Sequence, residues 1–197
     1  MNLPNKLTII RMLLVPIMVI IPFLNIQGEW MGVPTTYWII DAIFIIASIT
    51  DKFDGYLARS RNQVTTFGKF LDPLADKILV LAAMIMLVEF GKLPAWIPII
   101  VLTREFIVSG YRLIAVEKGG KVIAASVLGK LKTVTQMLAI ILAFIDVNPF
   151  FAFANGNLTG NTLLINASVS ILMIISVIAT IFSGIDYIKG GKELLKD

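Results

Sequence analysis

The sequence of 197 residues contains no cysteine and no histidine, and only 15% of its residues are charged. The absence of cysteine excludes disulfides and thiolate metal sites, and the absence of histidine excludes imidazole ligands and histidine catalysis. Any metal ion must therefore be bound by oxygen atoms, which favours hard ions such as Mg, Ca or Mn.

Hydrophobic residues are abundant instead, at 57% of the chain. Soluble domains average about 25% charged residues. Several apolar runs approach the roughly 20 residues that cross a bilayer core, and they are continuous rather than alternating, which predicts helices. The first run, after "MNLPNK", is expected to be retained as a membrane helix rather than cleaved as a signal peptide. The sequence thus predicts an all-α polytopic membrane protein.

Six transmembrane helices are predicted, forming one bundle and a single membrane domain over 1–197. Clusters of Gly, Pro, Asn and Thr, such as "GEWMGVPTT" and "NPFFAFANGNLTGN", separate the apolar runs. The predicted helices lie near 6–26, 36–57, 70–90, 94–117, 126–147 and 162–187.

Basic residues gather at alternate connections and at both ends of the chain. The positive-inside bias then places both termini, and the second and fourth connections, in the cytoplasm of a multi-pass cell-membrane protein. The net charge of +4 suits anionic lipid head groups, and without a basic stripe interleaved with aromatics no nucleic-acid partner is expected. The basic residues concerned are Lys6, Arg11, Lys52, Arg59, Arg61, Lys69, Lys77, Arg104, Arg112, Lys118, Lys121, Lys130, Lys132, Lys189, Lys192 and Lys196.

Four aspartates interrupt the apolar pattern near the second connection. Asp51 and Asp54 are three residues apart, and Asp72 and Asp76 are four apart, so each pair lies on one helix face. A helical hairpin would bring the pairs together, where four carboxylates would repel one another unless divalent cations neutralised them. A cluster of this size could hold two ions about 4 Å apart.

The alternative is that these acids are solvated and paired with neighbouring cations. Ionisable residues at membrane level nevertheless favour a functional site, and Gly55 and Gly68 lie where a missing side chain would admit a ligand. The glycines could also serve helix packing. The neighbouring cations are Lys52, Arg59, Lys69 and Lys77.

The pattern Asp51-x-x-Asp54-Gly55-x-x-Ala58-Arg59, eight residues, Gly68-x-x-x-Asp72-x-x-x-Asp76 resembles the signature of the CDP-alcohol phosphotransferases. The resemblance implies six membrane helices, two divalent ions, Mg or Mn, and release of CMP from a CDP-linked substrate. It implies that the four aspartates surround the metals and that Asp76 acts as the general base. It places Gly55, Ala58, Arg59 and Gly68 at the nucleotide.

The N-terminal stretch "NLPNKLTIIRMLLVP" places Asn5, Thr8 and Arg11 on one side of the first helix. Asn5 could instead cap the helix, and Arg11 could extend to the membrane surface as a snorkelling cation. The stretch resembles the start of bacterial phosphatidylglycerophosphate synthases, which implies that the three residues approach the nucleotide.

Two further segments, "LTREFIVSGYR" and "GKLKTVTQM", combine cations with polar side chains in an apolar setting. Arginine and lysine together suit a phosphate monoester, such as sn-glycerol 3-phosphate. The alternative is a basic belt on anionic lipids, to which Lys118 and Lys121 could equally belong. The candidate acceptor-phosphate residues are Thr103, Arg104, Arg112, Lys130, Lys132 and Gln136.

These segments also resemble the phosphatidylglycerophosphate synthases, so the resemblance covers residues 1 to about 137, and the last helix adds little. It implies CDP-diacylglycerol and glycerol 3-phosphate as substrates, transfer of the phosphatidyl group, and a homodimer in contact with membrane lipids. Two alternatives stay open. The acceptor could be inositol phosphate, serine or phosphatidylglycerol, or the aspartates could serve a divalent-metal transporter.

Overall fold

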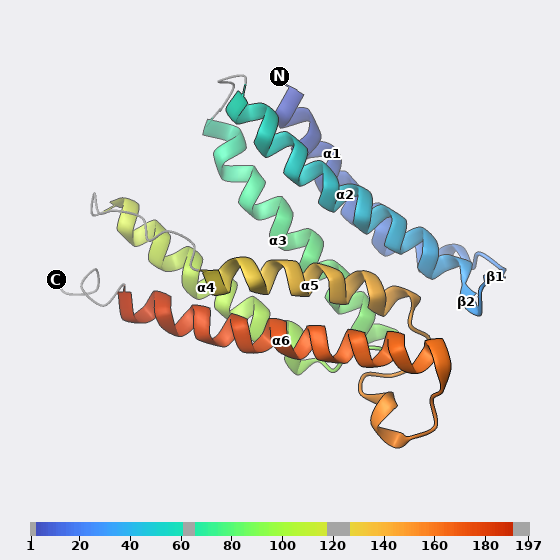
Figure 1. Cartoon of the computed structure of the whole chain (residues 1–197). Helices are drawn as coiled ribbons and strands as arrows, with labels where there is room; N and C mark the ends of the chain where they lie inside the picture. Colours follow the sequence, from blue (N-terminus) through green and yellow to red (C-terminus); the bar gives the residue numbers. More distant parts are fainter. Residues whose placement is uncertain (1–2, 61–65, 118–126, 191–197) are drawn as a thin grey trace. The chain divides into compact units, whose positions relative to one another are not determined.

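Figure 1 shows a computed structural model of the protein. The structure describes the backbone of residues 3–60, 66–117 and 127–190, and the side chains of 5–50, 71, 74–115 and 127–189. Contacts divide the chain into a first unit, Met1–Lys92 with Ile141–Asn148, and a second unit, Leu93–Ile140 with Pro149–Asp197.

The described residues form six α-helices, as the apolar runs predict, and the all-α class is confirmed. Each helix coincides with one predicted run, and the ends differ by up to six residues. Flanking polar residues extend the second, third and sixth helices, whereas the first ends earlier than predicted, at Ile20, where a 3-10 turn begins. The helices are α1 (Leu3–Ile20), α2 (Thr35–Ser60), α3 (Thr66–Glu89), α4 (Trp96–Glu117), α5 (Val127–Ile145) and α6 (Gly160–Gly190).

The connection between α1 and α2 is more regular than the sequence predicts. A 3-10 turn, η1 (Ile21–Leu24), follows α1, and the strands β1 (Glu29–Trp30) and β2 (Val33–Pro34) form a small antiparallel hairpin. Met31 and Gly32 at its tip both have positive φ, at 55° and 78°. Positive φ at both central residues suits the twist of a two-residue hairpin.

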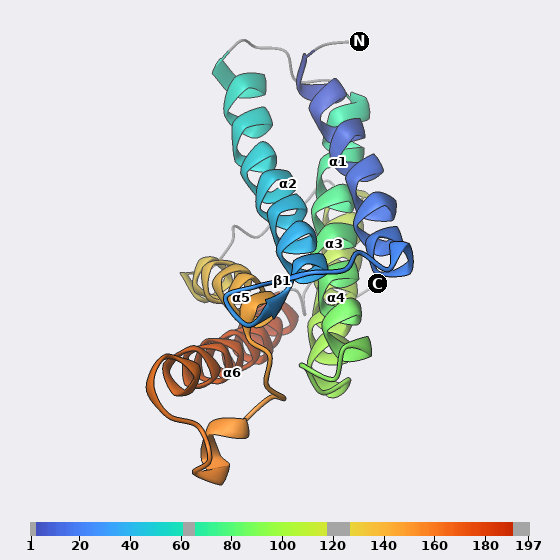
Figure 2. The same ribbon diagram turned by 90° about the vertical axis from the view of Figure 1, so that its right-hand side faces the viewer.

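In the first unit, α1 packs against α2 and α3, and α2 packs against α3. Figures 1 and 2 both show these three helices side by side, with α2 and α3 running in opposite directions. Ala47 on α2 and Ala75 and Ala83 on α3 are fully buried, and such small residues let membrane helices approach closely. The end of α5 joins this unit, where Phe144 faces Phe44 with ring centroids 6.4 Å apart.

In the second unit, α4 packs against α6. The segment after α5 is tied back to α6 by hydrogen bonds: the backbone N–H of Phe153 donates to Asn166 Oδ1 at 2.8 Å, and Asn166 Nδ2 donates to the Pro149 carbonyl at 3.0 Å. The buried amide of Asn166 thereby links α6 to two backbone groups of this segment.

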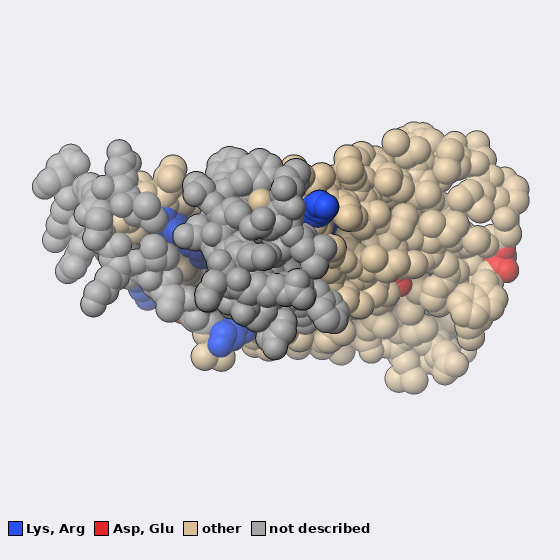
Figure 3. Space-filling view, turned by 90° about the horizontal axis from the view of Figure 1, so that it is seen from above, with Lys and Arg blue, Asp and Glu red and all other residues tan. Residues whose placement is uncertain are grey.

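The exposed faces of all six helices carry large apolar side chains. Soluble helices expose polar residues instead, so these faces suit contact with lipid. Figure 3 shows the same scarcity of charge, because tan atoms dominate the part of that face drawn in colour. The exposed apolar residues include Ile10, Leu13, Ile17 and Ile20; Ile46 and Ile49; Leu74, Ile78 and Ile85; Ile99, Phe106 and Leu113; Leu131, Val134 and Leu138; and Ile171, Ile175, Ile178, Phe182 and Ile185.

Three stretches of the described residues are long and apolar enough to cross a membrane: Asn5–Leu24, Val127–Ile145 and Gly160–Lys189. They indicate a membrane protein. At 1.5 Å per residue, the 22 residues of α4 are also long enough to cross a bilayer core. Its length includes Arg104, Glu105 and Arg112, so its apolar character is interrupted by charge.

A buried lysine fixes the end of α3 to the end of α5. The backbone N–H groups of Gly91 and Lys92 donate to Val88 and Leu87, closing α3 with Gly91 in the left-handed conformation. Lys92 Nζ donates to the carbonyls of Ala143 at 3.3 Å and Phe144 at 2.8 Å in the last turn of α5. The cation thus caps the negative end of that helix.

The rest of the Lys92 environment is aromatic and acidic. Its Nζ lies 3.8 Å from the ring centroid of Tyr37, and Asp41 and Asp146 are buried nearby. Burial lowers the pKa of Lys92 to about 8, against which Asp146 and Asp41 favour the charged form. The ammonium therefore stays protonated at neutral pH.

We expect Lys92→Met to destabilise the protein by about 3–5 kcal/mol, because it removes one partner from a buried ionic cluster. Thermal unfolding in detergent at neutral pH measures the change, with Lys189→Met, at an exposed lysine of α6, as the control. A Lys92→Met melting temperature equal to that of the control would contradict a stabilising role for the buried ammonium.

Candidate active site

The four aspartates lie on a helical hairpin, as the sequence predicts. Asp51 and Asp54 belong to the last part of α2, and Asp72 and Asp76 to the first part of α3. Since α2 and α3 are packed and run in opposite directions, the hairpin brings these two stretches of backbone to the same end (Figure 1). Asp76 is half-buried.

The other signature side chains lie outside the described residues. These are Asp51, Asp54, Gly55, Ala58, Arg59, Gly68 and Asp72, so their roles stay predictions. Among the side chains that the structure does describe, no three acids gather closely enough to hold a metal ion.

The backbone arrangement fits a divalent cation. The sequence places four aspartates in the two helix segments that meet at this end, and carboxylate oxygens are the ligands that hard divalent ions prefer. Asp51, Asp54, Asp72 and Asp76 would supply them, and histidine and cysteine ligands are excluded by the composition.

The three candidate nucleotide-binding residues of α1, Asn5, Thr8 and Arg11, are buried. Arg11 is among the largest side chains with no exposed surface, and Thr8 and Asn5 are 1% and 7% exposed. A snorkelling arginine would reach the membrane surface, so the burial of Arg11 contradicts that alternative. Asn5 lies inside α1 rather than at its cap. The three residues form a buried polar stripe on a helix that packs against α2 and α3.

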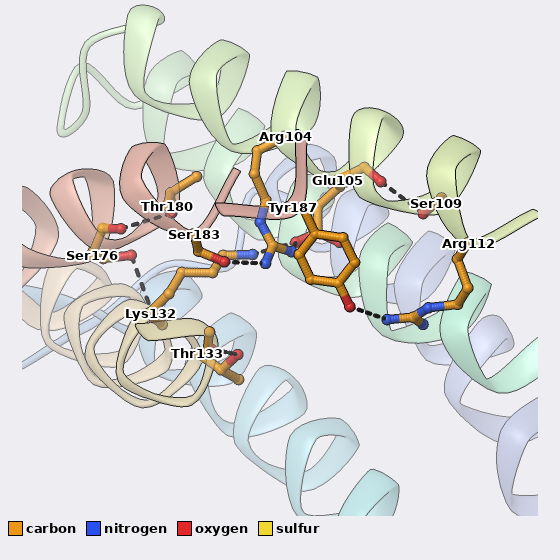
Figure 4. Close-up of polar contacts among 11 residues, drawn as sticks. Arg104, Glu105, Ser109, Arg112, Lys132, Thr133, Ser176, Thr180, Ser183 and Tyr187 are labelled. Carbon is orange, nitrogen blue, oxygen red and sulfur yellow. Dashed lines mark hydrogen bonds and ion pairs between the residues drawn. The ribbon is translucent and has the colours of Figure 1, made fainter. Parts of the chain in front are cut away.

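The second unit brings together two of the predicted acceptor-phosphate cations. Arg104 on α4 and Lys132 on α5 both donate to Oε1 of Glu105, with Arg104 Nη1 at 3.1 Å from it. Arg104 Nη2 also donates to Ser183 Oγ on α6 at 2.5 Å. Figure 4 shows the side chains converging from the three helices.

Arg112 joins this group through α6. Its Nη2 donates to the Tyr187 hydroxyl at 3.5 Å, a long hydrogen bond, and the Tyr187 ring centroid lies 5.8 Å from Cζ of Arg104. The ring is therefore close enough to the Arg104 guanidinium for a cation–π contact. Tyr187 is buried, whereas Arg112 is exposed.

The remaining predicted acceptor residues are placed differently. Thr103 is exposed, and its hydroxyl donates to the Ile99 carbonyl of its own helix at 2.8 Å. Lys130 is exposed, whereas Gln136 is buried one turn after Lys132. The predicted set thus separates into a group of three cations, of which Arg112 is exposed, a buried amide, and two exposed residues outside that group.

Sequence reasoning missed the contributions of Glu105 and of α6. The signal in α6 was available: Ser176, Thr180, Ser183 and Tyr187 follow one another at intervals of four, three and four, which places them on one face. All four are buried, and Ser176 Oγ donates to the Lys132 carbonyl at 3.4 Å. Neutral hydroxyls within an apolar run indicate a site less strongly than arginines do, because they are also common in helix packing.

The chain belongs to the CDP-alcohol phosphatidyltransferase family, whose sequence profile matches residues 1–182. It is 42% identical to the CDP-diacylglycerol–glycerol-3-phosphate 3-phosphatidyltransferase of Bacillus subtilis, covering 99% of this chain and 97% of the relative. The protein of the same name from Haemophilus influenzae is 38% identical, and the alignment covers 100% of this chain and 96% of the relative. A probable phosphatidylglycerophosphate synthase of Mycobacterium tuberculosis is 37% identical, and the alignment covers 95% of this chain and 80% of the relative.

The family predicted from the aspartate spacing is thereby confirmed, and the protein is an enzyme of this transferase type. Members of the family generally use divalent metal ions, in agreement with a composition that allows only oxygen ligands.

Proposed function

We propose that the protein transfers the phosphatidyl group of CDP-diacylglycerol to sn-glycerol 3-phosphate, giving phosphatidylglycerophosphate and CMP. The observation that carries this proposal is the convergence of Arg104, Lys132 and Arg112 on one polar cluster in a membrane protein of this family. Relatives that carry the name of this activity are aligned over nearly the full chain. A phosphorylated acceptor explains why cations gather within apolar helices.

In the proposed site, Asp51, Asp54, Asp72 and Asp76 hold two divalent ions, Mg or Mn. When bound, the ions neutralise charge on the diphosphate and on the departing CMP. Asp76 accepts the proton of the glycerol 3-phosphate hydroxyl as that oxygen attacks the phosphorus attached to diacylglycerol. The bond from that phosphorus to CMP breaks, and CMP leaves as a phosphate monoester.

The remaining signature residues, together with the buried stripe of α1, serve the nucleotide in this proposal. Gly55, Ala58 and Gly68 leave room for cytidine, and Arg59 and Arg11 provide positive charge. Asn5 and Thr8 contribute hydrogen-bonding groups on the same face of α1. The acceptor phosphate is bound by the cations of α4 and α5, with Thr103, Lys130 and Gln136 at their margin.

All six helices cross the cell membrane in the proposed arrangement, as one domain over 1–197. Both termini and the active site face the cytoplasm, as the basic residues at alternate connections favour. The exposed apolar faces of α2, α3 and α4 support membrane crossing by these helices too. The functional unit is a homodimer, by resemblance to the family.

The proposal is tested by CMP release from CDP-diacylglycerol in the presence of Mg, with purified protein in detergent and four acceptors in parallel. We expect release with glycerol 3-phosphate and none above background with inositol phosphate, serine or phosphatidylglycerol. Release with one of the latter would keep the phosphotransfer chemistry and overturn the acceptor. Metal uptake into proteoliposomes without CDP-lipid, and no CMP release, would favour a transporter.

A further inference from the structure

The acidic residue Glu105 lies between two cations of the acceptor-phosphate cluster. Its Oε1 accepts hydrogen bonds from Arg104 on the same helix and from Lys132 on α5. The three side chains are only 19%, 13% and 8% exposed, respectively. At this depth ion pairs are poorly screened, and two neighbouring cations would repel each other strongly without the shared carboxylate.

Arg104 is held from a second side by α6. Its Nη2 donates to Ser183 Oγ, and Gly184 allows the close approach, since a Cβ at that position would lie 3.3 Å from Cγ of Arg104. Two nitrogens of the guanidinium are therefore engaged by Glu105 and Ser183. The third, Nε, is buried and has no hydrogen-bond partner within the described part of the chain. The guanidinium is fixed in orientation with a donor still to be satisfied.

The charges of the cluster sum to the complement of a phosphate monoester. Arg104, Arg112 and Lys132 contribute three positive charges and Glu105 contributes one negative charge, so the net charge of the cluster is +2. A phosphate monoester carries roughly −1.5 to −2 at neutral pH. Removing the carboxylate would raise the charge of the cluster to three and release the two cations from their shared partner.

We propose that Glu105 is a positioning residue for the acceptor phosphate: it holds the Arg104 guanidinium and the Lys132 ammonium together and sets the net charge of the cluster to match a phosphate dianion. This inference rests on the proposed function and deepens it, because it assigns the second charged residue of the α4 cluster a role in acceptor binding. Ser183 supports it by fixing Arg104 from α6.

The test compares Glu105→Gln, which keeps the shape and removes the charge, with Glu105→Asp, which keeps the charge. The KM for glycerol 3-phosphate should rise roughly 10- to 100-fold in Glu105→Gln, the range expected for lost charge-assisted hydrogen bonds. The KM for CDP-diacylglycerol should stay within about twofold, and Glu105→Asp should recover part of the acceptor affinity. Glu89→Gln, at an exposed glutamate of α3, is the matched control.

A loss of folding would lower the apparent kcat with both KM values unchanged, or remove the protein from the monodisperse fraction. A rise in KM confined to glycerol 3-phosphate therefore isolates the positioning role. The effect of Glu105→Gln should also shrink in an Arg104→Gln background, since one of the cations that it positions is then absent. An unchanged or lower KM for glycerol 3-phosphate in Glu105→Gln would overturn the inference.

Calorimetric titration of the wild type and Glu105→Gln with glycerol 3-phosphate separates this inference from the proposed function. Wild-type protein that binds glycerol 3-phosphate but releases no CMP with it overturns the proposed function alone. Weaker binding by Glu105→Gln then still supports the positioning role. Equal or tighter binding by Glu105→Gln, or no binding by the wild type, overturns the positioning role.

Discussion

Asp76→Asn is expected to reduce CMP release roughly 100- to 10,000-fold, the range that general acid–base catalysis supplies. An amide has the same shape as a carboxylate but neither accepts the acceptor's proton nor carries the negative charge that a divalent ion requires. Asp76 is the one member of the aspartate set whose side chain the structure describes, and it is half-buried at the start of α3.

The measurement is the initial rate of CMP release at saturating CDP-diacylglycerol and glycerol 3-phosphate, over a range of Mg concentrations. Asp186→Asn, at an exposed acid on α6, is the matched control and should retain the wild-type rate. A well-folded Asp76→Asn protein with a rate within about threefold of wild type would contradict the assigned role of Asp76.

Arg104→Gln is expected to lower kcat/KM for glycerol 3-phosphate about 10- to 100-fold, because hydrogen bonds to charged groups contribute about 1.5–3 kcal/mol. Arg104→Lys should restore little of this loss. The guanidinium contacts Glu105 and Ser183 through two different nitrogens, and an ammonium on a flexible stem does not reproduce a planar fork.

The measurement is steady-state kinetics with each substrate varied in turn. We expect a lower kcat/KM for glycerol 3-phosphate and a KM for CDP-diacylglycerol near the wild-type value. Lys6→Gln, at an exposed cation of α1, controls for the general loss of positive charge. If Arg104→Gln left acceptor kinetics unchanged, an acceptor without a phosphate group, such as serine, would fit the site better.

The helices could be predicted from sequence because apolar runs of membrane length have one stable conformation in lipid. The family could be predicted because Asp51, Asp54, Asp72 and Asp76 have the spacing of the family signature. The β1–β2 hairpin could not be predicted from the sequence, because Met31 adopts a positive φ that methionine does not favour.

Contacts between distant residues account for most of what the sequence did not reveal. The sequence indicates that Lys92 is a charged residue in a loop. In the structure, its ammonium donates hydrogen bonds to two carbonyls of α5, which lie 51 and 52 positions away in the chain. Ser183 and Tyr187 lie 79 and 75 positions from the arginines that they contact. Arg104 could be predicted from its charge, its apolar setting and the resemblance of its segment. The role of Glu105 depends on the contact that Lys132 of α5 makes with the same carboxylate oxygen as Arg104.

The most direct test of the proposed reaction uses glycerol 3-phosphate labelled with ¹⁸O in its hydroxyl groups. The labelled acceptor is incubated with CDP-diacylglycerol and the protein, and the lipid and nucleotide products are analysed by mass spectrometry. Attack by the acceptor hydroxyl on the phosphorus attached to diacylglycerol predicts labelled phosphatidylglycerophosphate and unlabelled CMP, with both lost in Asp76→Asn. Label in the nucleotide product, or CMP release without a labelled lipid, would contradict phosphatidyl transfer to glycerol 3-phosphate.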